Sequence, residues 1–212
     1  MNLKNSLKRY TRGGVFALKS ILWEKPRGLD FSMRQKTVGI KTEGNHGYAL
    51  TPKKAFDNVV QRLDISASDK FIDIGCGKGG VLYFASKYYP FGRVAGVEIE
   101  DSLYEIAVRN FRKPNIPSIE IFHDNAVTFD RYNEFNVFYL FNPFEPNIYR
   151  EVVDSILSTL NDSRNDSRVY LICYGGTVTK YIKDKRAMEL IDSYTDKVRD
   201  SEVNIWKWEK KE

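Results

Sequence analysis

Hydrophobic positions follow two different periods along this chain, and from residue 70 onward the two alternate regularly. Short apolar runs, typical of buried strands, are each followed by a stretch with the spacing of an amphipathic helix. The expected strands are Phe71–Ile74, Arg93–Val97, Ile119–Phe122, Asn136–Phe141 and Arg168–Cys173, and the expected helices are Val81–Tyr88, Ser102–Phe111 and Pro146–Leu160. This alternation predicts βαβ units, and therefore a parallel sheet with helices on both faces.

The two ends of the chain depart from this alternation. In the tail, Glu189–Ser193 and Val203–Trp208 have the pattern of two more strands, the second half-buried and suited to an antiparallel edge. Before the core, apolar residues have helical spacing over residues 3–22. Thr51 and Pro52 then open an expected helix that runs to Leu63, with Thr51 as its N-cap.

These patterns predict two parts. Residues 1–44 form a basic N-terminal helical extension, and residues 45–212 form one α/β domain. We expect this domain to be a Rossmann-like three-layer sandwich, with a mostly parallel seven-stranded sheet and an antiparallel C-terminal edge hairpin. The chain has 212 residues, which is long enough for such a domain to bury a core of its own.

Charge is spread unevenly along the chain, whose formal net charge is +5. The first 41 residues carry ten basic side chains against two acidic ones, Glu24 and Asp30, so this segment is +8 and the remainder is −3. One interpretation is an anionic partner for the basic segment: nucleic acid, an acidic protein surface or anionic lipid. The other interpretation is a solvated helix face without a partner.

Cysteine usage and hydrophobicity exclude several classes of protein. Cys76 and Cys173 cannot form a disulfide framework, and no Cys/His cluster accompanies them, so we expect a reducing compartment and no metal site. No stretch approaches the ~20 apolar residues of a membrane-spanning helix. The basic N-terminus lacks the cleavage site of a secretory signal, so we expect a cytoplasmic protein without a transmembrane segment.

The most informative stretch is the glycine-rich turn between the first strand and its helix. Gly75, Gly77 and Gly80 there spell GxGxxG, which allows a tight turn and close approach of a ligand. Asp73 lies two residues before the first glycine, at the strand end where ligands bind in such sheets. Its carboxylate would repel the pyrophosphate of a dinucleotide, but it suits S-adenosylmethionine, which carries an ammonium and a sulfonium group.

Two further carboxylates follow the next two strands. Glu98 closes the second strand ~20 residues beyond the loop, where a carboxylate can accept hydrogen bonds from ribose hydroxyls. Asp124 follows the third strand, where it could accept from an adenine amino group. Such carboxylates near a core are unfavourable without partners, so the three acids indicate a binding site for an adenosine-bearing cofactor.

With Asp73, the glycines at 75, 77 and 79, Glu98 and Asp124 in this order, the chain resembles the bacterial-type class I S-adenosylmethionine-dependent methyltransferases over residues 45–210. The resemblance implies that Asp73 and the loop backbone hold the methionine part, Glu98 the ribose, and Asp124 with Asn125 the adenine. A lid segment is implied at Tyr48–Thr51. The implied cofactor contacts are Tyr48, Thr51, Asp73, Gly75, Cys76, Gly77, Gly79, Glu98, Ile99, Asp124, Asn125 and Asn142.

The turn after the fourth strand, Asn142-Pro143-Phe144, is the expected catalytic segment. In the family this position faces the transferable methyl group; an amide oxygen there can fix a substrate nitrogen, and an aromatic ring can close over it. The turn resembles that of adenine N6 methyltransferases without one proline, and more weakly that of Dot1-like lysine methyltransferases. The acceptor therefore stays open among protein lysine, nucleic acid base and small molecule, and a strand-terminating turn is the alternative.

We therefore expect an S-adenosylmethionine-dependent methyltransferase that acts on a nitrogen of a protein or nucleic acid. The main alternative is a non-catalytic module with the same fold that binds nucleic acid or another anionic surface through the basic N-terminal segment. Lys78, inside the glycine loop, either contacts the cofactor carboxylate or is solvated.

Overall fold

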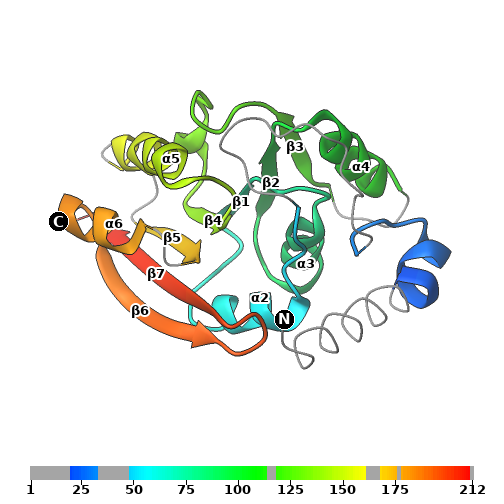
Figure 1. The fold of residues 1–212 in the computed structure, drawn as a ribbon, viewed down its shortest axis with the longest axis horizontal. Coiled ribbons are helices and arrows are strands. Elements are labelled where there is room, and N and C mark those ends of the chain that lie inside the picture. Colours follow the sequence, from blue (N-terminus) through cyan, green and yellow to red (C-terminus); the bar gives the residue numbers. More distant parts are fainter. Residues whose placement is uncertain (1–19, 33–47, 114–117, 161–167, 176–177, 211–212) are drawn as a thin grey trace, which may run out of the picture.

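The computed structural model describes residues 20–32, 48–113, 118–160, 168–175 and 178–210. Most of the helix expected over residues 3–22 therefore lies outside the described residues. In the remaining chain the seven expected strands are present, and Figure 1 shows them as one sheet. They are β1 (Lys70–Ile74), β2 (Arg93–Glu98), β3 (Glu120–His123), β4 (Val137–Phe141), β5 (Arg168–Tyr174), β6 (Glu189–Asp196) and β7 (Ser201–Glu209).

The sheet has the order β3-β2-β1-β4-β5-β7-β6, and its first five members run parallel. Strand β7 is antiparallel to both β5 and β6, so the tail forms the predicted edge hairpin. The predicted fold class, a Rossmann-like sandwich with a mostly parallel sheet, is confirmed.

Helices cover both faces of the sheet because successive residues of each strand point to opposite sides. On β4, Phe138 and Leu140 pack into a core with α5 (Pro146–Ser158) and α6 (Thr179–Lys185). Tyr139, between them, packs into the other core with α2 (Lys53–Val60) and α3 (Gly80–Tyr88). Helix α4 (Asp101–Phe111) lies beside β2 and β3, and its Phe111 joins this second core.

Helix α2 differs from its prediction at both ends. It begins at Lys53 with Pro52 as the N-cap residue, and it ends at Val60 and not at Leu63. Thr51 does not cap the helix, because its side chain is buried and its hydroxyl lies 3.3 Å from the hydroxyl of Tyr139. Helix α6 was not predicted; it has only seven residues and a single buried one, so its periodicity is too short to detect.

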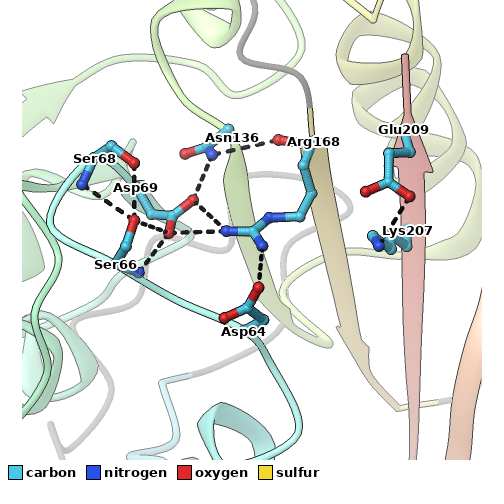
Figure 2. A network of polar contacts seen from close by, with 8 residues as sticks. All are labelled: Asp64, Ser66, Ser68, Asp69, Asn136, Arg168, Lys207 and Glu209. Carbon is cyan, nitrogen blue, oxygen red and sulfur yellow. Dashed lines mark hydrogen bonds and ion pairs between the residues drawn. The ribbon is translucent and has the colours of Figure 1, made fainter. Parts of the chain in front are cut away.

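At the amino-terminal edge of the parallel strands, Asp69 and Asn136 hold the strand starts together (Figure 2). The Asn136 amide donates to Asp69 at 2.7 Å and accepts from the N–H of Lys70, also at 2.7 Å. Arg168, at the start of β5, forms an ion pair with Asp69 at 3.2 Å. These contacts fix the register of β1, β4 and β5 at the edge opposite the predicted site.

Candidate functional site

The register of the sheet brings the predicted site residues to one edge. Asp73 on β1 is level with Gly96 on β2 and Tyr139 on β4, and Glu98 at the end of β2 is level with His123 on β3. Asp124 and Asn142 directly follow their strands, so all of these residues lie at the carboxyl ends of neighbouring parallel strands. This is the edge at which α/β sheets bind ligands.

The glycine loop and the turn after β4 are in direct contact. Gly75 has φ 76°, and a Cβ placed on it would lie 2.7 Å from the Cβ of Pro143. A side chain at position 75 would therefore need a strained backbone and would push the two segments apart. The loop and the predicted catalytic turn thus form one surface.

The loop is poorly suited to an anion, because most of its N–H groups are already paired. Those of Gly75 and Cys76 both donate to the carbonyl of Val97, at 2.9 and 3.0 Å. The N–H of Gly77 donates to a Glu98 carboxylate oxygen at 2.7 Å. A pyrophosphate needs free donors at such a loop, so this arrangement favours a ligand that donates hydrogen bonds.

Two carboxylates are buried beside this loop. Burial, together with the nearby charge of Glu98, raises the pKa of Asp73 well above its ordinary value. Burial also raises the pKa of Glu98, although hydrogen bonds from the N–H groups of Glu100 and Gly77 act against this. No hydrogen bond to the Asp73 side chain is found among the residues that the structure describes, so a cationic ligand group would supply the partner that this carboxylate lacks.

Beyond Glu98, the predicted site residues are more exposed to solvent. Asp124 and Asn125 are exposed; Asp124 accepts the N–H of Asn125 at 2.7 Å, and Asn125 accepts the N–H of Val127 at 2.9 Å. The backbone N–H of Asp124 donates to the carbonyl of Glu98 at 3.2 Å, which ties the two predicted cofactor positions together. Ile99, between them along the edge, is half-buried.

The turn after β4 has a backbone that few residues adopt. Asn142 has φ 42°, and a Cβ placed on Gly175 would lie 3.0 Å from the Cβ of Asn142. Such left-handed residues cluster at functional sites. Phe144, in contrast, is buried, and its ring packs edge-on against Tyr149 in the core at 6.3 Å. Its predicted role beside an acceptor nitrogen stays a prediction.

The segment before α2 covers the loop from the other side. The ring of Tyr48 lies over Gly77, where a Cβ would come within 2.4 Å of a ring carbon, and its hydroxyl donates to the carbonyl of Phe31 at 2.6 Å. Cys76 contributes packing: a Cβ on Gly96 would lie 2.7 Å from its sulfur, and burial raises the pKa of its thiol. The cofactor roles predicted for these residues stay predictions.

The sequence interpretation of Lys78 as a solvated side chain is wrong. Its side chain is 1% exposed and forms an ion pair with Asp30 at 2.8 Å. It is therefore not solvated, and its contact with a cofactor carboxylate stays a prediction. Asn110 on α4, which no pattern singled out, is fully buried beside this pair.

The described ranges contain neither a cluster of metal ligands nor a membrane-spanning helix. No three His, Cys, Asp or Glu side chains among them are grouped so that they could hold a metal ion. Within the same ranges, every helix is too short or too polar to span a bilayer.

Residues 71–163 match a family described as a methyltransferase domain. A protein-lysine N-methyltransferase of Saccharolobus islandicus (strain REY15A) is 30% identical over 69 residues, which are 32% of this chain and 43% of that protein. The match thus spans less than half the length of that relative.

Solved structures share the fold at low sequence identity. An RNA methyltransferase from Salinibacter ruber, in complex with S-adenosyl-L-homocysteine, has a TM-score of 0.60 at 16% identity and covers 77% of this chain and 95% of its own. A precorrin-6y C5,15-methyltransferase from Geobacter metallireducens GS-15 has a TM-score of 0.58 at 14% identity, with 76% and 90% covered.

Proposed function

We propose that this chain is a class I S-adenosylmethionine-dependent methyltransferase, which transfers a methyl group from that cofactor to a nitrogen acceptor on a protein or nucleic acid. The observation that carries the proposal is the pair of buried carboxylates, Asp73 and Glu98, beside a glycine loop whose N–H groups are largely paired within the protein. Such a site accepts hydrogen bonds and positive charge. The cofactor offers both, through its ammonium and sulfonium groups.

The residues at this edge fit the cofactor part by part. Asp73 and the loop carbonyls would hold the ammonium group. Glu98 keeps acceptor capacity beside its two backbone partners and would hold the ribose hydroxyls. Asp124 and Asn125, at the open end of the edge, would hold the adenine. When bound, the cofactor supplies an electrophilic methyl group.

The chain's own contribution to the transfer is then mostly positioning. Asn142 is held beside the glycine loop because Pro143 packs on Gly75. Its amide oxygen can accept a hydrogen bond from the acceptor amine and so orient the nitrogen lone pair. Alignment of reacting atoms alone can supply a large part of a rate enhancement.

Titration calorimetry with S-adenosylmethionine, and separately with NAD, tests the cofactor assignment. We expect binding of S-adenosylmethionine alone, weakened at least 10-fold by Asp73→Asn and by Glu98→Gln. Asp64→Asn is the matched control, because Asp64 is an exposed carboxylate paired with Arg168 at the opposite edge. A wild-type protein that is folded and binds no S-adenosylmethionine at millimolar concentration would exclude this function.

A second candidate function, binding of a nucleic acid, is favoured by a row of alternating cations and rings, which we call the cation–aromatic row. Lys53 lies 4.5 Å from the ring centre of Tyr88, and Lys87 lies 5.9 Å from the same ring. Lys87 also contacts Tyr83, and Trp23 continues the row with Arg27 over its ring at 5.3 Å. Tyr83 is buried, but the exposed ring of Tyr88 can stack on a base while the neighbouring cations neutralise phosphates.

Filter binding of single-stranded RNA across a salt series tests this candidate. We expect Arg27→Ala with Lys87→Ala to lower the affinity and to reduce the salt slope by about one per lost phosphate contact. Lys185→Ala, on α6 against the other face of the sheet, is the control. Salt-dependent binding that survives Asp73→Ala, without methyl transfer, would favour a binding module over an enzyme.

A cytoplasmic location suits both candidates. Cys76 and Cys173 are free and buried, as expected of thiols in a reducing compartment. The sequence comparison supports a protein-lysine acceptor and the cation–aromatic row supports a nucleic acid, so methylation assays should include both acceptor classes.

A further inference from the structure

The segment of residues 24–32, which we call the strap, is held in shape by a buried carboxylate. Glu24 is fully buried, and one of its oxygens accepts the N–H groups of Phe31 and Ser32 at 3.1 and 2.9 Å. The hydroxyl of Ser32 donates to the other oxygen. Because these donors are satisfied within the strap, it forms a closed turn around Glu24.

Two polar contacts, an ion pair and a shared amide side chain, join the strap to the glycine loop. Asp30 forms an ion pair with Lys78 at 2.8 Å; Lys78 is 1% exposed, whereas Asp30 is 33% exposed. The Asn110 amide on α4 donates to the carbonyls of both Asp30 and Lys78, at 3.1 and 3.0 Å, and accepts the N–H of Asp30 at 2.9 Å. One side chain thus bonds to the backbones of the strap and of the loop.

Apolar side chains also pack between the strap and the glycine loop. Cβ atoms placed on Gly79 and Gly80 would meet Phe111 and Leu50, at 2.4 and 2.2 Å, so these glycines leave room for the residues that pack beside the strap. Phe31 is 1% exposed, and its ring lies 5.5 Å from that of Tyr83 on α3. The loop is therefore held between β2 on one side and the strap on the other.

We propose that Asp30, Lys78 and Asn110 are positioning residues for the cofactor loop, and that the strap holds residues 75–80 in the conformation that binds the cofactor. The proposal rests on the proposed function. Lys78 cannot turn outward without losing Asp30, and loss of Asp30 removes an ion-pair partner from a buried charge. The Lys78 side chain therefore couples the strap to the loop, and cofactor binding should in turn stabilise the closed strap.

The variants Asp30→Asn, Lys78→Met and their double mutant test this coupling. Calorimetry with S-adenosylhomocysteine should show at least 10-fold weaker binding for each single variant. The affinity of the double mutant should be no lower than that of the weaker-binding single variant, because both substitutions break the same ion pair. Asp57→Asn is the matched control, since it removes the Lys53–Asp57 pair of the same 2.8 Å length on α2. It should leave the affinity unchanged.

Hydrogen exchange of the ligand-free proteins gives a readout that needs no cofactor. Residues 75–80 should exchange faster in Asp30→Asn and Lys78→Met than in the wild type and Asp57→Asn, at temperatures where all variants are folded. Unchanged exchange and unchanged affinity in folded Asp30→Asn would overturn the proposal, even if Lys78→Met failed to fold. A wild type that binds no S-adenosylhomocysteine would instead refute the proposed function, while the exchange data would still decide whether the strap holds the loop.

Discussion

The contact between Gly75 and Pro143 gives a prediction whose size can be worked out from the structure. In Gly75→Ala a residue with a Cβ must adopt φ 76°, and that Cβ would lie 2.7 Å from the Cβ of Pro143. The left-handed backbone costs about 1–2 kcal/mol, less about 0.4–1 kcal/mol for the stiffer unfolded chain. Overpacking against Pro143 adds about 1–3 kcal/mol. Together these contributions predict a loss of about 1–5 kcal/mol in the free energy of unfolding.

Gly28→Ala is a matched control for the backbone contribution. Gly28 has a similar φ of 64°, but the atom that its Cβ would meet is the end of the flexible Lys113 side chain, which can move aside. Urea unfolding should therefore show a loss of only about 1 kcal/mol there. Pro143→Gly in the Gly75→Ala background should recover part of the loss, because it removes the opposing Cβ. Equal losses for Gly75→Ala and Gly28→Ala, with no recovery, would refute a close contact between the loop and the turn.

Three further predictions concern single side chains. Asp69→Asn should lower the free energy of unfolding by about 2–3 kcal/mol at pH 7, because it breaks a buried network. Burial acts to raise the pKa of Asp69, but hydrogen bonds from Ser66 and Asn136 and the charge of Arg168 outweigh it and hold this pKa below its ordinary value. The difference in the free energy of unfolding between variant and wild type, measured in urea, should therefore be present above pH ~4 and shrink as the pH falls below it. Asn142→Gly, which keeps a left-handed backbone without strain, should lower the rate of methyl transfer about 100-fold while leaving calorimetric cofactor binding within a few-fold; an unchanged rate would exclude the amide from the reaction. Burial raises the pKa of Cys173 to about 12, so a thiol reagent at pH 8 should label Cys173 and Cys76 only after unfolding.

The strand ends could be predicted from the sequence because their positions follow from periodicity alone. Once β1, β2 and β3 were recognised as parallel, the residues at their carboxyl ends had to meet at one edge. Asp73, Glu98 and Asp124 are therefore found where the pattern put them. The hairpin of β6 and β7 could also be predicted from the sequence, since hydrophobic and polar residues alternate in the tail as they do in a half-buried strand.

The strap could not be predicted, because no periodicity relates its residues to the loop. Asp30 and Asn110 are 80 residues apart in sequence. Their contact depends on how the strap, the glycine loop and helix α4 pack together in the folded protein. The burial of Lys78 could not be predicted for the same reason, because nothing in the sequence relates it to Asp30.

The glycines of the loop were interpreted as space for a ligand, yet each makes room for a different part of the protein. Gly75 accommodates Pro143, Gly77 the ring of Tyr48, Gly79 the ring of Phe111 and Gly80 Leu50. The loop therefore packs against the predicted catalytic turn, the segment before α2, helix α4 and the residues beside the strap. Its conformation is set by these neighbours together, so an affinity change in a glycine variant does not by itself locate a ligand contact. A side chain whose hydrogen-bonding capacity is unused within the protein is a better probe, and at this edge the best of them is Asp73, whose buried carboxylate has no hydrogen-bond partner in the described part of the chain.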